Sequence, residues 1–216
     1  VRVIGQQWWW AFEYPDSGVV TADELHVPVG RPVHLELESK DIIHSFWVPR
    51  LAGKQDVVPG RTNTINFTAD AVGEYSGQCA EFCGAQHANM KFRVIVQTEE
   101  EFEAWLQQQQ QPAVEPQPGS IEAQGKELFM TNCRGCHTIQ GTEAEGKVGP
   151  DLTHFGSRQT IAGLVVPYST DNLKQWIHNA PSVKPGQPGR SIQMPAFTAL
   201  TDDEVNAIAA YLESLK

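Results

Sequence analysis

The first half of the chain alternates apolar and polar residues with a period of two. From 33 to 38, valine and leucine alternate with histidine and glutamate, and further short apolar runs cover 24–29, 63–68 and 91–96. This period is typical of a half-buried strand, and proline, glycine and aspartate separate the runs as turn residues do. We therefore expect a small antiparallel β-sandwich over residues 1–106.

A helix and a linker follow the predicted strands. Thr98 and Glu101 form a capping box, and apolar residues come after it at helical spacing, so we expect a helix to close this domain. Residues 107–119 are rich in glutamine and proline, and such a segment cannot bury a core. Its prolines favour an extended form, which predicts a semi-rigid linker spanning roughly 40 Å at full length.

From residue 120 onward the apolar pattern has the period of a helix. It predicts helices over 121–131, 170–179 and 201–215, the last behind a second capping box that begins at Thr201. Loops rich in glycine and proline separate these segments. We expect an all-α domain over 120–216, whose small core a covalently held cofactor would complete.

Composition narrows the possible functions. The 216 residues carry a formal net charge of −10 with acidic residues in excess in both halves, which argues against a nucleic-acid partner. No apolar run approaches the roughly 18 residues that span a bilayer, so the chain as given is expected to be soluble. All four cysteines lie near histidine or methionine, a pattern that favours ligand duty over disulfides.

One group of these residues has the attachment signature of a c-type haem. Cys133, Cys136 and His137 form a Cys-x-x-Cys-His motif, in which the two thiols bond to the porphyrin and the histidine reaches the iron. A thioredoxin-like redox pair would need a βαβ pattern around the motif. Half of a zinc site would need a second pair of ligands nearby. We therefore expect covalent haem c.

A haem iron that carries electrons needs a sixth ligand. Met194 lies a few residues before the last predicted helix, and a thioether ligand raises the reduction potential of haem iron. Met130 is too close to the attachment cysteines and is expected in the core. His154 and His178 are the alternatives to Met194.

The haem domain resembles the class I cytochrome c family. Gly125 and Phe129 on the first predicted helix and Tyr211 on the last look like the contact between terminal helices in that family. Pro150 lies in a loop similar to the one whose proline carbonyl accepts a hydrogen bond from the proximal histidine. The resemblance implies that Pro150 orients His137 and strengthens it as a ligand.

A second cluster of soft ligands lies on one short loop, at Cys79, Cys83, His87 and Met90. Two thiolates four residues apart could bridge two metal ions, with the imidazole and the thioether as terminal ligands. The remaining ligand must come from an earlier strand, and His44 fits. His26 and His34 alternate with core positions and are expected to face solvent. The alternative is a structural zinc site with two cysteines and two histidines.

This second cluster resembles the binuclear CuA domain of subunit II of haem-copper oxidases, over residues 1–106. The resemblance implies a cupredoxin-like Greek-key sandwich with copper ligands His44, Cys79, Glu81, Cys83, His87 and Met90. Glu81 would bind through its main-chain carbonyl, while its carboxylate would face a magnesium site shared with subunit I. Trp8 matches the position at which electrons enter the domain, and Gln6 stands where the family often has histidine.

A CuA domain joined to a cytochrome c domain resembles subunit II of caa3-type cytochrome c oxidases. The resemblance implies that electrons pass from an external donor to haem c, then to CuA and on to subunit I. There dioxygen is reduced to water and protons are pumped, and this chain alone would hold no dioxygen site. The donor would be a small cytochrome, an iron–sulfur protein or a quinol-oxidising complex.

The same resemblance bears on location. That subunit normally begins with a membrane hairpin, so we expect a soluble ectodomain on the outer, periplasmic or extracellular, face of a bacterial cytoplasmic membrane, without its anchor. Two other functions stay open. A nitrous oxide reductase-like carrier would be expected to have tryptophan in place of Glu81, and a copper-delivery or redox-sensing module would need an exposed, exchangeable site.

Overall fold

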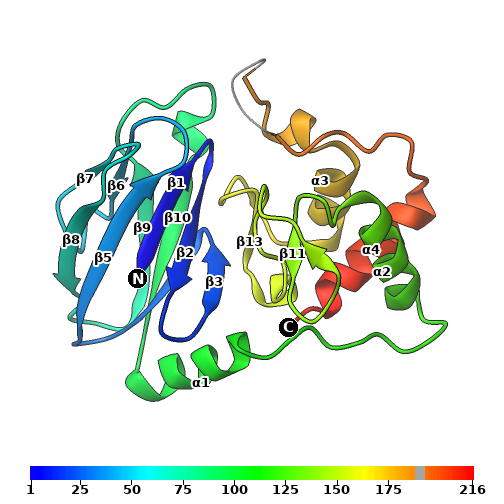
Figure 1. Ribbon diagram of the computed structural model, residues 1–216, viewed down its shortest axis with the longest axis horizontal. Helices are drawn as coiled ribbons and strands as arrows, with labels where there is room; N and C mark the ends of the chain where they lie inside the picture. The colour runs from blue at the N-terminus through cyan, green and yellow to red at the C-terminus, as the bar shows by residue number, and fades with distance from the viewer. Residues whose placement is uncertain (188–192) are drawn as a thin grey trace. The chain divides into compact units, whose positions relative to one another are not determined.

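The computed structural model describes residues 1–187 and 193–216 and divides the chain into two compact units, Val1–Gln110 and Gln111–Lys216. The first unit holds ten strands and one α-helix, and the second is mainly helical (Figure 1). No helix in the described part of the chain has the length and apolar composition to cross a membrane.

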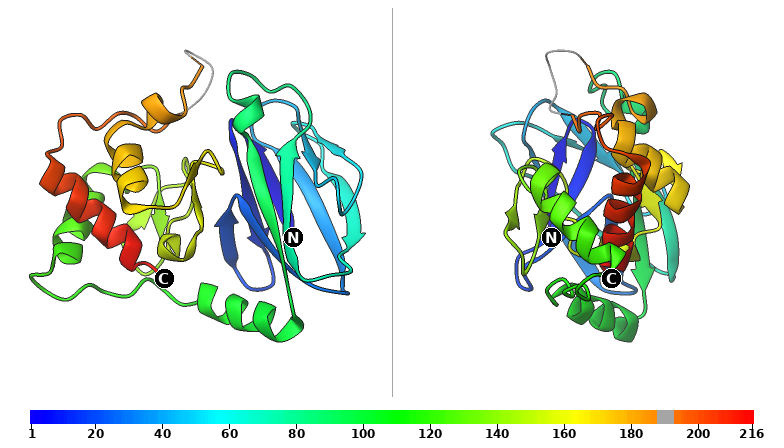
Figure 2. Two further views of the ribbon diagram at one scale, coloured as in Figure 1. Left: turned by 180° about the vertical axis from the view of Figure 1, so that it is seen from behind. Right: turned by 90° about the vertical axis from the view of Figure 1, so that its right-hand side faces the viewer.

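The first unit is a sandwich of two five-stranded sheets, ordered β3-β2-β1-β5-β8 and β4-β10-β9-β6-β7 (Figure 1, Figure 2). Its strands are β1 (Arg2–Gln6), β2 (Trp9–Tyr14), β3 (Val19–Ala22), β4 (Glu24–Pro28), β5 (Pro32–Ser39), β6 (His44–Trp47), β7 (Gln55–Val57), β8 (Asn63–Thr68), β9 (Gly73–Cys79) and β10 (Lys91–Gln97). The predicted sandwich is confirmed. The expected antiparallel pairing was too narrow, because β1 pairs with β5 and β4 with β10 in parallel.

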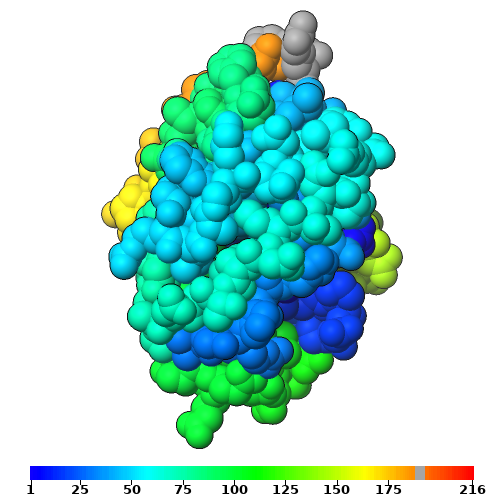
Figure 3. Space-filling model, turned by 90° about the vertical axis from the view of Figure 1, so that its left-hand side faces the viewer, coloured from blue at the N-terminus to red at the C-terminus, as the bar shows by residue number. Residues whose placement is uncertain are grey.

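Strand β5 shows why these residues form a sandwich. Val33, Leu35 and Leu37 are buried, while the residues between them are exposed or half-buried, as the period of two predicts. On β8, Phe67 lies opposite Val33 and Ile65 opposite Leu35. Residues of the β5–β8 part of the chain, in cyan, cover one face of the unit in the space-filling view (Figure 3).

Helix α1 (Glu99–Gln109) closes the first unit behind the predicted capping box of Thr98 and Glu101. The helix continues through Gln109, three residues into the segment expected to be a linker. Gln110 then donates its side-chain amide to the carbonyl of Ser17, 3.1 Å away. The first residues of the expected linker are therefore part of the first unit.

The next linker residues lie against the second unit. The carbonyl of Gln111 is 3.0 Å from Nε2 of His154, and Ala113 N–H donates to the carbonyl of Gln140 over 3.0 Å. Glu115 pairs with a lysine of the first helix of that unit, Lys126. This part of the linker is docked, whereas the sequence led us to expect an extended tether.

In its described residues, 111–187 and 193–216, the second unit contains three α-helices and two small strand pairs. The helices are α2 (Ile121–Asn132), α3 (Thr170–Val183) and α4 (Asp202–Ser214), and the strands are β11 (Thr138–Ile139), β12 (Ala144–Glu145), β13 (Thr160–Ile161) and β14 (Val166–Pro167). A short 3-10 turn, η2 (Phe155–Ser157), lies between the strand pairs. The predicted helical domain is confirmed, and the two-residue strands are an addition to it.

Helices α2 and α4 cross in close contact at a glycine. A Cβ at Gly125 would lie 1.9 Å from the carbonyl oxygen of Ala207, so any larger residue would force the helices apart. Beside this crossing, the rings of Phe129 and Tyr211 meet edge to face with centroids 5.8 Å apart. The expected contact between the terminal helices is present.

Candidate metal centres

The first cluster lies at one end of the sandwich, where several elements bring distant residues together. His44 is the first residue of β6, and Cys79 is the last residue of β9, its neighbour in the sheet. Met90 lies between the short turn η1 (His87–Asn89) and strand β10. The loop after β9 thus returns to the sheet at Met90, whose carbonyl accepts a hydrogen bond from Cys79 N–H over 2.9 Å.

Two sulfur atoms form the centre of this cluster. The Sγ atoms of Cys79 and Cys83 are 3.7 Å apart. The Cys79 sulfur is 3.9 Å from Nδ1 of His44 and 3.2 Å from the carbonyl oxygen of Glu81. The Cys83 sulfur is 3.5 Å from Nδ1 of His87 and 3.8 Å from Sδ of Met90. The structure therefore brings together all six predicted ligands, and each sulfur has its own pair of neighbouring donors.

The burial of the donor side chains and the lowered pKa of Cys79 favour metal binding. His44, Cys83 and Met90 are fully buried, and Cys79 is 4% exposed. The hydrogen bond from the Cys83 thiol holds the pKa of Cys79 well below the ordinary thiol value, against the opposing effect of burial. Since the thiolate is the form that binds metals, the cluster favours the binding-competent state of Cys79.

Asp41 orients the imidazole of His44 and was not found from the sequence. Its Oδ1 lies 2.7 Å from Nε2 of His44, so this nitrogen carries the proton and Nδ1 faces the sulfur of Cys79. Burial acts to lower the pKa of His44, but its hydrogen bonds to Asp41 and Cys79 raise it above the usual value. Carboxylates commonly hold metal-binding histidines in this way.

Trp8 contacts the same cluster from the turn between β1 and β2. Its indole N–H donates to the carbonyl of Cys83 over 2.8 Å, and the side chain is only 5% exposed. Glu81 and Phe82 behave differently. Both are exposed, and Phe82 is 77% exposed while its ring meets that of His87 edge to face.

The Cys-x-x-Cys-His motif follows helix α2. Cys133 is buried and Cys136 exposed, and burial raises the pKa of Cys133 to about 12. Nδ1 of His137 donates to the carbonyl of Pro150 over 2.8 Å, which leaves Nε2 as the ligand atom. A Cβ at Gly149 would lie 2.5 Å from Cε1 of His137, so only glycine lets this loop approach the ring so closely.

The candidates for the sixth ligand occupy different surroundings. Met194 is half-buried in a segment that is held against the end of α3. Gln193 donates its amide to the carbonyl of Lys184, and Phe197 N–H donates to the carbonyl of His178 over 2.9 Å. His154 is buried, and its Nε2 lies 3.0 Å from the carbonyl oxygen of Gln111. Met194 stays a prediction.

Two family models match the chain, one over each unit. The model described as "Cytochrome C oxidase subunit II, periplasmic domain" matches residues 19–98, and the model "Cytochrome c" matches residues 122–216. The chain belongs to the cytochrome c oxidase subunit II family. Its first unit carries the periplasmic domain of that family and its second unit a cytochrome c domain.

Known subunit 2 proteins can be aligned with this chain over its whole length. Cytochrome c oxidase subunit 2 of Alkalihalophilus pseudofirmus is 39% identical over 217 residues, which are 100% of this chain and 61% of the relative. The protein of the same name from Bacillus subtilis is 34% identical over 226 residues, covering 100% of this chain and 62% of the relative. The chain therefore spans about three fifths of the length of these relatives.

A solved structure is also similar to the subunit II domain. The crystal structure of the periplasmic domain of subunit II of cytochrome oxidase of Bradyrhizobium japonicum is 31% identical, with a TM-score of 0.48. The match covers 49% of this chain and 88% of the chain in the solved structure.

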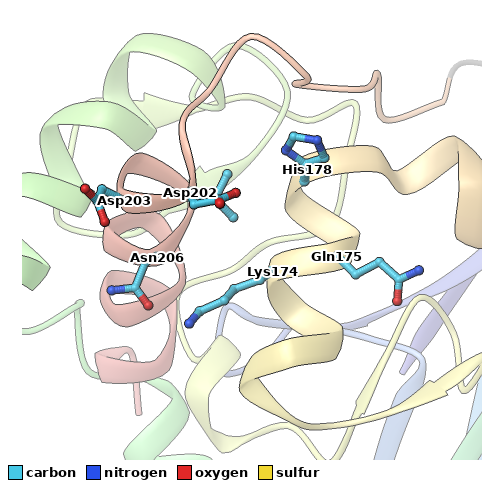
Figure 4. Close-up of a pocket in the computed structure, with 7 residues that line it drawn as sticks. Lys174, Gln175, His178, Asp202, Asp203 and Asn206 are labelled. Carbon is cyan, nitrogen blue, oxygen red and sulfur yellow. The ribbon is translucent and has the colours of Figure 1, made fainter.

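The cytochrome c domain has a pocket whose lining residues include none from its Cys-x-x-Cys-His motif. It has a volume of about 430 Å³ and lies between α3 and α4 (Figure 4). Lys174, Gln175 and His178 of α3 and Asp202, Asp203 and Asn206 of α4 are among the residues that line it. His178, an alternative iron ligand by sequence, therefore lines this pocket.

The burial of His26 in the subunit II domain contradicts a prediction from the sequence. We expected it to face solvent, but it is 9% exposed and its ring stacks on Trp105 of α1 at 4.0 Å. The apolar side chains of α1 cover this part of β4, which the strand pattern alone does not reveal. His34 is exposed, as expected.

Proposed function

We propose that this chain transfers electrons within a terminal respiratory oxidase of the caa3 type. Electrons would pass from an external donor by way of haem c and binuclear copper to subunit I, which reduces dioxygen to water and pumps protons. The observation that carries the proposal is the arrangement of Cys79 and Cys83, each with its own pair of further donors, in one chain with a Cys-x-x-Cys-His motif.

The donor set of the first cluster fits two copper ions better than one zinc ion. A zinc site of two cysteines and two histidines would use four donors and leave Sδ of Met90, 3.8 Å from the Cys83 sulfur, without a role. The thiolates of Cys79 and Cys83 would hold two copper ions, with one histidine and one weaker donor, Met90 or the Glu81 carbonyl, beside each sulfur. Copper held there would supply a one-electron couple.

The protein around the cluster limits its rearrangement. Trp10 lies edge to face against His44 at 6.0 Å and against Phe46 at 5.7 Å, and Phe92 stacks on Phe46 at 4.6 Å. These fully buried rings exclude water from one side of the centre. Because a dry, close-packed shell moves little, it favours fast electron transfer. The same burial argues against a copper-delivery module, which needs an exchangeable site.

The residues of the second motif fit a covalent haem. Cys133 and Cys136 would attach the porphyrin, and His137 would bind the iron through Nε2 while Pro150 holds Nδ1–H. Met194 would be the sixth ligand. Haem c supplies a one-electron couple there. Pro150 and Gly149 fix the ring of His137, so its orientation does not depend on the haem.

The partners and location follow from the family and the exposed residues. We place the chain on the periplasmic or extracellular side of the membrane, docked on subunit I. The exposed carboxylate of Glu81 is free of the copper donors and would face the magnesium site at that interface. Trp8 would be the point where electrons enter the copper domain. A small cytochrome, an iron–sulfur protein or a quinol-oxidising complex would supply them.

Metal stoichiometry tests the proposal. We expect two copper and one iron per chain in protein matured with haem attachment and supplied with copper. Cys83→Ser is the matched variant, because it removes one bridging thiolate and leaves the haem motif unchanged. It should keep the iron and lose the copper. One zinc or one copper per wild-type chain after reconstitution would refute the binuclear assignment.

A further inference from the structure

The turn between β1 and β2 lies between the two segments that carry the copper donors. One segment leads into β6, with Asp41 before the strand and His44 as its first residue, and the other is the loop from Cys79 to Met90. Gln7, in the turn, makes a hydrogen bond to each of them. The two bonds reach across 34 and 76 residues of sequence.

The main chain of Gln7 fixes the carboxylate that orients His44. Its N–H donates to Oδ2 of Asp41 over 2.6 Å, while Oδ1 of the same carboxylate lies 2.7 Å from Nε2 of His44. Ile42 N–H also donates to Oδ1, over 2.7 Å. With both oxygens bonded, the carboxylate cannot rotate without breaking a bond, so the His44 ring is held in one orientation.

The side chain of Gln7 fixes the other donor segment. Its Nε2 donates to the carbonyl of Cys83 over 2.8 Å, beside the indole N–H of Trp8 at 2.8 Å. A carbonyl oxygen has two lone pairs, and both are used here. The peptide group that follows Cys83 is therefore held in one orientation.

The two cysteines need this support to different degrees. Cys79 ends β9 and lies opposite Phe46 of β6, two residues from His44, so the sheet itself holds its sulfur beside that imidazole. Cys83 lies in the loop beyond β9, outside the strand ladder. Its position relative to the sheet depends on contacts such as those from Gln7.

We propose that Gln7 is a positioning residue of the copper centre, which it serves by tying the His44 segment to the Cys83 loop. This inference rests on the proposed binuclear site. Gln7 touches no donor atom and would act only by setting the distance and orientation of the two donor segments. Its loss should change the electronic structure of the copper and loosen its binding, without changing the stoichiometry.

The neighbouring glutamine provides a matched control. Nε2 of Gln6 is buried but has no hydrogen-bond partner among the described residues. Gln6→Met and Gln7→Met thus each remove one side-chain amide, at adjacent positions. Only Gln7→Met also removes a hydrogen bond to the carbonyl of Cys83. Both variants would be made in the full chain with haem and copper, and their copper loss to excess EDTA and electron paramagnetic resonance spectra would be measured.

We expect Gln7→Met to lose copper about 10-fold faster than wild type, since partners behind metal ligands typically contribute 10–100-fold to affinity. Its copper hyperfine pattern should also shift. Gln6→Met should stay within about twofold of wild type, as expected for an amide that makes no hydrogen bond. Equal copper loss and identical spectra in the two variants would overturn the proposal while leaving the binuclear site intact.

Two other outcomes also decide the question: a Gln7→Met variant that does not fold, and a wild-type protein that does not hold two copper ions. If Gln7→Met does not fold, Gln7→Asn keeps an amide but withdraws it by one methylene, and the same spectral shift is expected; an unshifted spectrum would refute the positioning role. If wild type itself does not hold two copper ions, the proposed function fails, and that outcome is seen before any variant is compared.

Discussion

Lowering the pH should destabilise the first domain through His26. Its ring is buried between β4 and α1, stacked on Trp105, with Nδ1 2.8 Å from Oε1 of Gln97. Its main-chain N–H donates to the hydroxyl of Tyr14 over 2.8 Å. These neighbours are an indole, an amide and a phenol, and burial lowers the pKa of His26 to about 4 despite the bond to Gln97.

The sign of the effect follows from the two states of the protein. Above the unfolded pKa of about 6.5, His26 is neutral in both states and has no effect. As the pH falls below that value, the unfolded chain takes up a proton that the folded chain does not, so the free energy of unfolding decreases. The loss should reach about 2 kcal/mol at pH 5 and about 3 kcal/mol at pH 4.

The variant His26→Phe isolates this contribution, because it keeps a ring against Trp105 but cannot titrate. Urea unfolding would be followed by tryptophan fluorescence at pH 7, 6 and 5, with five of the six tryptophans in the first domain. The stability of the variant relative to wild type should rise by about 2 kcal/mol from pH 7 to pH 5. Metal loss at low pH affects both proteins and cancels in the difference.

The reasoning would be refuted if the stability of His26→Phe relative to wild type stayed constant between pH 7 and pH 5. That result would mean that His26 gains its proton in the folded state as easily as in the unfolded chain.

Two further predictions concern the cytochrome c domain. Gly125→Ala places a Cβ 1.9 Å from the carbonyl oxygen of Ala207, so the domain should lose about 1–2 kcal/mol, overpacking outweighing the gain in helix propensity. Thermal unfolding followed by haem absorbance measures this, and an unchanged stability would refute the packing argument. Met194→Ala should lower the reduction potential and abolish the near-infrared band of thioether-bound ferric haem. An unchanged spectrum would assign the sixth ligand to another residue.

The sequence predicted strand β5, whose buried positions are aliphatic, and missed strand β9, whose buried positions are not. Strand β5 buries valine and leucine, so its alternation is visible in the sequence. Strand β9 also buries alternate residues, but these are Tyr75, Gly77 and Cys79. A Cβ at Gly77 would lie 2.2 Å from Phe92, so the ring of a neighbouring strand fills the place of its side chain. The sequence of β9 alone does not show that a ring from a neighbouring strand fills this space.

The candidate sites divide in the same way. The metal donors were predicted because cysteine, histidine and methionine at short spacing are rare without a function. Asp41 and Gln7 were missed, since their bonds join segments far apart in the chain and neither residue type is distinctive. His26 was assigned to solvent because a strand pattern does not show which helix covers its outer face. Local chemistry was therefore predictable, and support from distant segments was not.

The contacts of the linker determine which changes in its length alter the connection between the two domains. Residues 111–115 are bonded to the cytochrome c domain, and so is helix α2, which begins at Ile121. The stretch between them is thus a surface loop of one domain. Insertions there should only enlarge that loop, whereas an insertion between Gln110 and Gln111 would add slack between the two redox domains. In the proposed function, variation in spacer length would alter electron transfer between the domains at the junction of Gln110 and Gln111.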